Sequence, residues 1–283
     1  MIGVRAGVYA GLLLAVGSLL FTMVFPAAPA SARQRATRVG VVAACVGLPL
    51  LLLEWPLRAG FLGGGRIDAA LDPGLLVMAA EGTQGIRFLL GGLGLVAVAV
   101  GLMLQPRRPG AGGAIGSAGA LAVAAGLAQA GHTGSYATWL LGPLLAVHVL
   151  AAAFWVGALL PLHRLAAIPQ EPAAARVLER FGRVAAGLVA ALVVAGLIMG
   201  WWLTGRFTAL VTSAYGQVLL GKLAAVAALL GLAALNKWRL VPAFAAGDAL
   251  AAPALRRSIR LESALVVTVV AVTALLTSAP SPP

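Results

Sequence analysis

Two histidines stand close together in the middle of the chain, and their imidazole rings are the side chains here best suited to bind a transition metal. His132 lies in the short polar segment GHTGSYAT, and His148 lies sixteen residues further on in an apolar run. Neutral imidazole binds copper, iron and zinc well. Trp155 follows seven residues after His148, so both share one face of a helix. We take His132 and His148 as candidate metal ligands; the alternative for His148 is a hydrogen bond to a neighbouring helix.

The depth of each histidine in a membrane limits how they act together. The run LLAVHVLAAAFWVGALLPLHR is apolar and long enough to span a bilayer. Counted from an entry near Thr138, a rise of 1.5 Å per residue places His148 about 15 Å deep, near mid-membrane. His132 lies at the outer rim. Either the GHTGS segment folds inward so that both bind one ion, or the histidines are two stations on one route.

Three further ionisable residues lie inside apolar runs, where a charge costs roughly 2.5–3.5 kcal/mol at the bilayer centre. Lys222 is either functional or extends its ammonium group to the outer interface. Glu54 lies at a similar depth, so a Lys222–Glu54 ion pair is one option. Glu262 stands beside Arg257 and Arg260, which predicts an ordinary interfacial ion pair.

The composition is that of an integral membrane protein. Hydrophobic residues make up 61% and charged residues 10% of the sequence, and the mean hydropathy is +1.00. The net charge of +12 comes from arginines in short segments between apolar runs. Such placement indicates topology signals and contact with anionic lipid, and argues against nucleic acid. The lone Cys45 excludes a disulfide framework, and we expect it to be a small buried packing residue.

The apolar runs predict an all-α bundle of eight transmembrane helices in one membrane domain, 1–283. Arginine-rich connections alternate with arginine-poor ones, which places both termini on the periplasmic side. In the long connection 58–83, the segment PGLLVMAAEG predicts a short interfacial helix with Met78 on its apolar face. The predicted spans are about 5–25, 39–57, 84–104, 113–131, 138–162, 181–203, 215–237 and 258–277.

Small residues spaced four apart predict close helix packing in the first and fourth spans. They are Gly3, Gly7 and Gly11, and then Gly112, Gly116, Ala120 and Ala124. Several enzyme signatures are absent, among them HExxH, the P-loop, GxSxG and a cysteine pair. The sequence therefore predicts neither an enzyme nor a nucleotide-driven pump.

Five segments of the chain have an order and spacing that are specific when taken together. They are GH at 131–132, HVLAAAFWVGALLPL at 148–162, RFGRVAAGLVAALVVAG at 180–196, YGQVLLGKLAAVAALLGLAALNKWRLVP at 215–242 and LRRSIRLESALVVTVVAVTALLTSAPSPP at 255–283. In these segments the chain resembles the copper resistance protein D (CopD) family of bacterial membrane proteins. The eight-span layout is similar throughout, and the motifs are strongest in residues 130–283.

The resemblance implies an inner-membrane protein that moves copper from the periplasm toward the cytoplasm, often alongside a periplasmic copper carrier, CopC. Copper is then the metal that the histidines bind, as Cu(I) or Cu(II). By position, the residues that match family motifs are His132, His148, Trp155, Gly157, Tyr215, Gly216 and Lys222.

Our leading hypothesis is a copper transporter in which the ion is captured near His132, passes His148 and leaves on the cytoplasmic side. Lys222 would orient a helix or tune the electrostatics of the path, with Tyr215 and Glu54 as further supporting residues. The thioethers of Met199, Met23 and Met103 assist if they face the route, and otherwise serve packing.

Two other hypotheses belong to different classes. Helical bundles with intramembrane histidines often hold haem b between two axial imidazoles, which would make the chain a membrane redox protein. The difference in depth between His132 and His148 argues against one shared haem. The third hypothesis is a membrane scaffold that only docks partners, in which neither histidine matters.

Overall fold

The computed structural model describes residues 1–129, 138–168, 171–204 and 213–278, and this part of the chain contains helices and no strands. The all-α prediction is confirmed. The elements are α1 (Ile2–Val24), α2 (Ala30–Leu62), η1 (Asp68–Leu71), α3 (Pro73–Ala80), α4 (Gly82–Leu104), α5 (Pro109–Ala128), α6 (Thr138–Leu165), α7 (Pro172–Thr204), α9 (Ala214–Leu235), the π-helix η3 (Asn236–Leu240), α10 (Val241–Ala245) and α11 (Ala251–Leu276).

Seven helical segments in the described residues are long and apolar enough to cross a membrane: α1, α2, α4, α5, α6, the continuous α9–η3–α10 segment, and α11. The 33-residue α7 coincides with the remaining predicted span, 181–203. Helix α2 begins at Ala30 instead of residue 39. Arg33, Arg35 and Arg38 therefore lie on its first turns instead of in a loop, because arginine is a good helix former.

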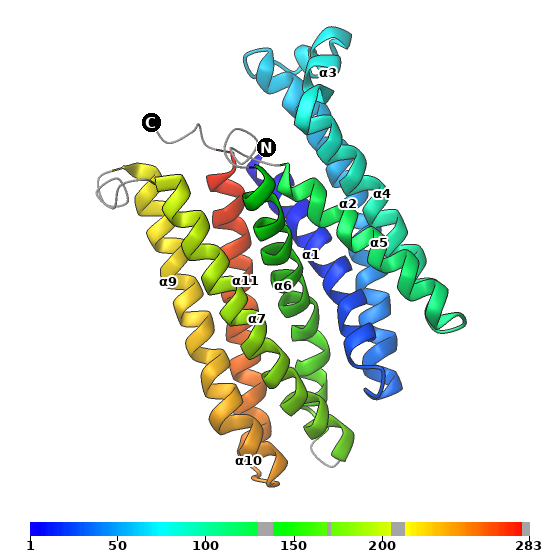
Figure 1. The fold of residues 1–283 in the computed structure, drawn as a ribbon, viewed down its shortest axis with the longest axis vertical. Coiled ribbons are helices and arrows are strands. Elements are labelled where there is room, and N and C mark those ends of the chain that lie inside the picture. Colours follow the sequence, from blue (N-terminus) through cyan, green and yellow to red (C-terminus); the bar gives the residue numbers. More distant parts are fainter. Residues whose placement is uncertain (130–137, 169–170, 205–212, 279–283) are drawn as a thin grey trace.

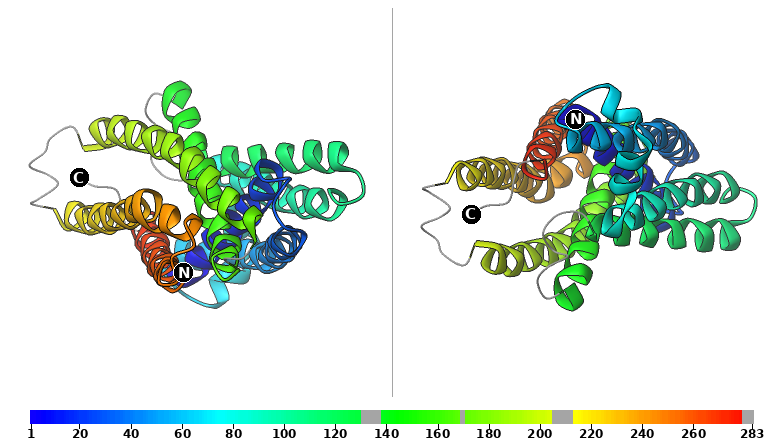
Figure 2. Two further views of the ribbon diagram at one scale, coloured as in Figure 1. Left: turned by 90° about the horizontal axis from the view of Figure 1, so that it is seen from below. Right: turned by 90° about the horizontal axis from the view of Figure 1, so that it is seen from above.

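The helices form two groups that meet along α1 and α6 (Figure 1). We call α1, α2, α4 and α5 the N-terminal group, and α6, α7, α9 and α11 the C-terminal group. The N-terminus and the end of α11 lie at the end of the bundle opposite α10. In the C-terminal group, the end of α7 and the start of α9 lie apart from each other (Figure 2).

Glycines allow the two groups to touch backbone to backbone. A Cβ atom added to Gly17 of α1 would lie 1.8 Å from the carbonyl oxygen of Ala153, and one added to Gly157 of α6 would lie 2.1 Å from the carbonyl carbon of Gly17. Any larger residue at either position would push the helices apart. Gly11 makes a similar approach to Gly47 between α1 and α2. Among the predicted small residues, Gly11 of the first span and Gly112 and Gly116 of the fourth make such close approaches, whereas a Cβ atom added to Gly3 would meet nothing within 4 Å.

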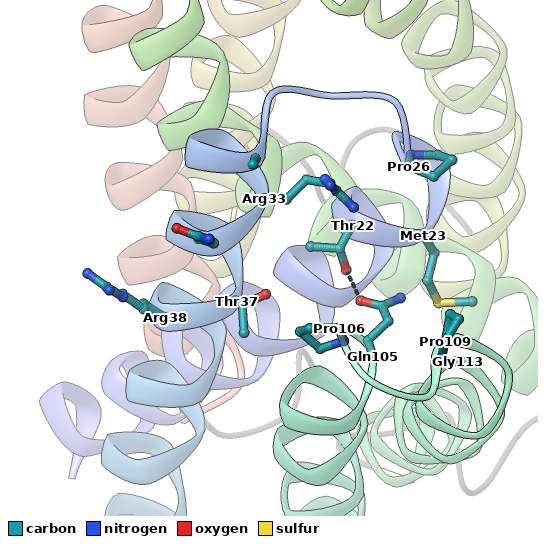
Figure 3. A pocket seen from close by; sticks show the side chains of 12 residues that line it. Thr22, Met23, Pro26, Arg33, Thr37, Arg38, Gln105, Pro106, Pro109 and Gly113 are labelled. Atoms are coloured by element: carbon teal, nitrogen blue, oxygen red, sulfur yellow. Dashed lines mark hydrogen bonds between the residues drawn. The ribbon is translucent and has the colours of Figure 1, made fainter.

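The N-terminal group encloses a cavity of about 590 Å³ at the end remote from the termini. Its lining includes Arg33 and Arg38 of α2 and Met23 of α1 (Figure 3). The hydroxyl of Thr22 donates a hydrogen bond to Gln105 Oε1 across 2.6 Å. Met23 therefore borders a basic cavity in the N-terminal group, whereas His148 belongs to the C-terminal group.

Two predictions about smaller features come out differently. The segment 73–80 does form the helix α3, whose start is capped by Asp72, and Met78 is exposed as expected. Its position on the membrane surface stays a prediction. The prediction that Cys45 is buried is wrong, because its side chain is exposed on the outer face of α2. From the sequence, a small apolar side chain that faces lipid cannot be distinguished from one that is buried between helices.

Candidate functional site

His148 lies within α6 and carries a ring nitrogen without a partner. Nδ1 is buried and has no hydrogen-bond partner in the structure. Lys222 lies on α9, so His148 and Lys222 belong to the same group of helices. Buried polar atoms are usually hydrogen-bonded, so an unpartnered imidazole nitrogen is suited to hold a ligand.

Trp155 lies on the same face of α6, two turns nearer the end with α10. Its side chain is 5% exposed. The indole N–H points toward the carboxyl of Glu262, yet it lies outside ordinary hydrogen-bond geometry and has no partner. Gly157, two residues on, faces α1 at the Gly17 contact. Trp155 and Gly157, which both match family motifs, therefore face different neighbours: Trp155 faces the interior of the C-terminal group, and Gly157 lies at the contact between the two groups.

Glu262 corrects the prediction made for it. We expected an ion pair with Arg257 or Arg260, but none forms, and both arginines are exposed. Glu262 is instead 3% exposed, and Asn236 Nδ2 donates a hydrogen bond to its Oε1 across 2.5 Å. The reason is helix phase: on α11, residue 262 points inward while residues 257 and 260 point outward. The prediction used only the short distance along the sequence between Glu262 and the two arginines, and it did not consider the direction in which each side chain leaves the helix.

A cavity of about 410 Å³ adjoins this carboxyl. It lies between α6, α7, η3 and α11, and its polar lining comes from Trp155, Asn236, Lys237 and Glu262. Apolar side chains of α7 and α9 complete it, among them Phe181, Val189 and Leu230. The cavity therefore provides space for water molecules beside a buried acid, within the C-terminal group of helices.

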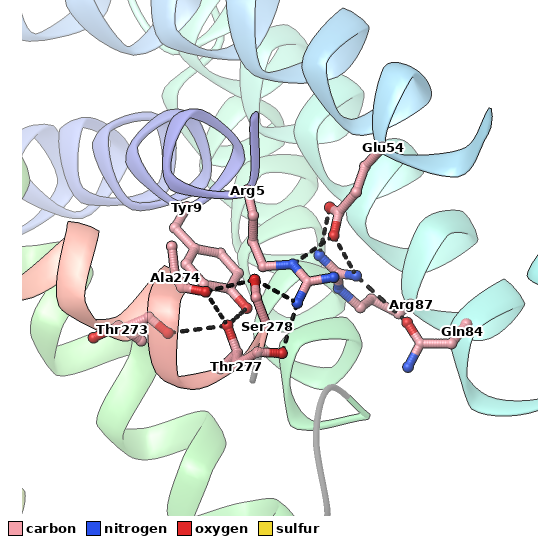
Figure 4. A network of polar contacts seen from close by, with 9 residues as sticks. All are labelled: Arg5, Tyr9, Glu54, Gln84, Arg87, Thr273, Ala274, Thr277 and Ser278. Atoms are coloured by element: carbon pink, nitrogen blue, oxygen red, sulfur yellow. Dashed lines mark hydrogen bonds and ion pairs between the residues drawn. The ribbon is translucent and has the colours of Figure 1, made fainter. Parts of the chain in front are cut away.

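Glu54 also contradicts its predicted partner. It does not pair with Lys222; instead it holds two arginines, Arg5 of α1 and Arg87 of α4 (Figure 4). Arg5 Nε lies 2.8 Å from Glu54 Oε1, and Arg87 Nη2 lies 2.7 Å from Oε2. Arg5 also donates to the Thr277 carbonyl near the chain end. Equal depth suggested the Lys222 pair, but Glu54 and Lys222 lie in different groups of helices.

Arg5 and Arg87 were missed by the sequence reasoning, although a signal existed. Each lies inside an apolar helix, is less than a tenth exposed, and would be costly there without a partner. Counting intramembrane arginines against intramembrane carboxylates would have pointed to Glu54. This cluster ties α1, α2, α4 and α11 together at the end where the termini lie.

The remaining predicted residues are only partly covered by the described structure. His132 lies outside the described residues. Met199 belongs to α7 and Tyr215 to the first turn of α9, and the structure describes the backbone of both. Met103 is 60% exposed on α4, in the other group of helices from His148. Among the described residues, no three His, Cys, Asp or Glu side chains gather in a way that could hold a metal ion.

Comparison with known proteins gives matches over most of the chain. The family model described as "Copper resistance protein D-like, N-terminal domain" matches residues 1–142, and the model "Copper resistance protein D" matches residues 175–276. Copper resistance protein D of Pseudomonas syringae pv. tomato is 28% identical over 264 residues, covering 86% of this chain and 83% of the relative. No solved structure matches. Most of α6, with His148 and Trp155, lies between the two matched regions.

Proposed function

The chain belongs to the copper resistance protein D family and is a multi-pass protein of the inner membrane with a role in copper resistance and homeostasis, and from that premise we propose that it moves copper across the bilayer through its C-terminal group of helices. It does so by binding and release, without breaking or forming bonds in a substrate. The direction we propose is from periplasm to cytoplasm.

The observation that carries this proposal is the unpartnered Nδ1 of His148. It lies in the middle of a membrane-spanning helix, and Trp155, two turns further along the same helix, lines the cavity beside Glu262. Imidazole is a good ligand for both Cu(I) and Cu(II). A single histidine binds copper weakly, because it leaves most of the coordination shell unfilled. Weak binding suits a site that must release its ion, as conduction requires.

The orientation follows from the distribution of arginines. The arginine-rich connections lie at the end of the bundle with α10, and we place that end in the cytoplasm. His132 would then receive copper at the periplasmic end, where a carrier similar to CopC would deliver it. A cysteine placed at Thr277 in a Cys45→Ser background should react with a membrane-impermeant maleimide added to the periplasm. Labelling only after the membrane is broken would reverse the orientation.

The deciding experiment compares copper binding and copper uptake in wild type and His148→Ala. In a titration with excess copper, we expect wild-type protein to approach one bound copper per chain and the variant to lose most of this binding, while both elute as the same folded species. His163→Ala is the matched control, because it removes a histidine from the same helix. His163 Nε2 is also buried without a hydrogen-bond partner, but His163 lies among Arg164, Arg256 and Arg260, whose positive charges oppose a metal ion. Unchanged copper uptake in His148→Ala would remove His148 from the mechanism.

The same samples test the redox alternative. Expression with excess haem followed by a visible spectrum would show a Soret band if the bundle holds haem b. His148 and His163 lie on one helix, so these two cannot clamp a haem from facing helices. A haem band that disappears in His148→Ala would replace copper transport by a cytochrome-like function.

A further inference from the structure

Glu262 is a buried acid with no cation beside it. Its side chain is 3% exposed, and its hydrogen-bond partner is the neutral amide of Asn236. Lys237 lines the same cavity, but its ammonium group lies over the Trp238 ring, 5.8 Å from the ring centre. The charged or titratable residues near this end, on the elements packed around Glu262 and on α11 itself, are Lys237, Arg239, Arg176, Glu179, Arg180, Arg183, His163, Arg164, Arg256, Arg257 and Arg260. Among the described residues, none of these forms an ion pair with Glu262.

The two polar groups beside Glu262 are each short of one hydrogen bond. Asn236 Oδ1 has no partner, and neither has Trp155 Nε1, although both residues are more than nine-tenths buried. Together they complement both states of a carboxyl group. As a carboxylate, Glu262 can accept from the Asn236 amide and the Trp155 indole; as a neutral acid, it can donate its proton to the amide oxygen. The site thus accommodates a change of protonation without leaving a buried charge unsolvated.

Local backbone geometry turns Asn236 toward this acid. Asn236 opens the five-residue π-helix η3, which interrupts the membrane-spanning segment formed by α9 and α10. Single π-helical turns inside α-helices are frequent at functional sites, because the extra residue re-aims a side chain. The cavity of about 410 Å³ lies against the same residues and is large enough for several water molecules. Water there would connect Glu262 with the cytoplasmic end of the bundle.

We propose that Glu262 is a proton-exchange site: it gives up its proton to water in the cavity when copper enters the path at His148, and takes a proton back when copper leaves. The proposal rests on the transport function proposed above. Each copper ion that enters is matched by one proton that departs from the Glu262 carboxyl, leaving a carboxylate. The carboxylate offsets the whole added charge of Cu(I), or one of the two charges of Cu(II), in a region of low dielectric, where an uncompensated charge is expensive.

The donor set favours a proton over a metal cation at Glu262 itself. Metal ions such as Mg²⁺ and Ca²⁺ require six or more oxygen ligands, and Mg²⁺ and Ca²⁺ sites use several carboxylates or carbonyls. Here one carboxyl and one amide oxygen are available, and the third group, the Trp155 N–H, is a donor that repels cations. A proton needs only one oxygen atom. Trp155 is therefore a positioning residue that stabilises the carboxylate form.

The first experiment counts protons released when copper binds. Copper is added to the purified protein in weakly buffered detergent solution containing a pH indicator. We expect about one proton per copper bound in wild type, and almost none in Glu262→Gln, which keeps the size and the hydrogen bond of the side chain. Glu179→Gln removes an exposed carboxyl of α7 and should release the wild-type amount. Equal proton release in wild type and Glu262→Gln would overturn the proposal.

The second experiment needs no copper, so it stands if the transport proposal fails. Infrared difference spectra recorded across a pH series should show a protonated-carboxyl band that titrates in wild type and in Glu179→Gln, and is missing in Glu262→Gln. In Trp155→Phe the band should persist to higher pH, because the carboxylate loses its indole donor. The absence of any titrating band assigned to Glu262 would overturn the proposal. A titration midpoint that moves with sodium concentration would assign the site to Na⁺ instead.

Discussion

Glu54 and Glu262 are both buried carboxyl groups inside membrane-spanning helices, and they lie at opposite ends of the molecule. Glu54 is held by two arginines from two helices, and both of its oxygens are in ion pairs of 2.7–2.8 Å. Glu262 has one neutral partner, two unpartnered polar neighbours and a cavity beside it. The first arrangement fixes a charge and joins helices. The second leaves a group free to change its charge. Burial alone does not separate structural from functional acids; the number and sign of their partners does.

Removing the carboxylate from the arginine cluster should have the largest effect. In Glu54→Gln, Arg5 and Arg87 remain buried without a counter-charge. Breaking one partner of a buried ion pair typically costs about 3–5 kcal/mol. We expect a large loss of folded protein, measured as the fraction that survives heating in detergent and elutes as a single species. Arg87→Lys, which keeps the charge but loses the forked geometry, should be intermediate. Wild-type thermal stability in Glu54→Gln would show that the cluster is dispensable.

A substitution at the contact between α1 and α6 tests whether the two regions depend on each other. Gly157→Val would place side-chain atoms where the backbone of Gly17 now lies. Overpacking of this kind costs typically about 1–3 kcal/mol. We expect lower thermal stability together with reduced copper uptake, since α6 carries His148. Gly187→Val is the control, because a Cβ there meets open space. Loss of uptake in both variants would remove the special role of this contact.

Glu262→Gln should have a much smaller effect on stability than Glu54→Gln. The substitution removes a group that costs energy to bury and leaves no cation unpaired. We expect the thermal midpoint to stay close to wild type, within about 1 kcal/mol in unfolding free energy. The comparison made above would collapse if both substitutions destabilised the protein equally, because Glu262 would then hold the bundle together as Glu54 does.

The exposed pair Arg66–Asp68 gives the smallest expected effect. The hydrogen bond from Arg66 lowers the pKa of Asp68 below its ordinary value. A lowered pKa in the folded state contributes stability that is present above the unfolded-state pKa and lost as pH falls through the folded-state value. Both side chains are largely exposed, so Asp68→Asn should not change the thermal midpoint measurably at neutral or acidic pH. A clear acid-sensitive loss would mean that the connection 58–83 packs more tightly than the structure indicates.

The number, order and approximate position of the helices could be predicted from the sequence, because long apolar runs and arginine placement report directly on the bilayer. Side-chain partners could not. Lys222 and Glu54 were expected at one depth but belong to different groups of helices, and Glu262 stands two residues from Arg260 but points the opposite way. Depth is encoded locally, by distance along one helix. Partnership depends on helix rotation and on which helices are neighbours, and both are set by contacts such as Gly17–Gly157 that span the chain.

The π-helix at Asn236–Leu240 also sets the rotation of the whole of α9 about its axis, relative to α10. One extra residue is accommodated in that turn. If the same residues wound as a regular α-helix, everything on the N-terminal side of this segment would be rotated by about 100°, the angle of one residue in a helix of 3.6 residues per turn. The side of α9 on which Lys222 lies, some four turns away, would change with it. The backbone geometry of this short segment is therefore as much a constraint on α9 as the types of its residues.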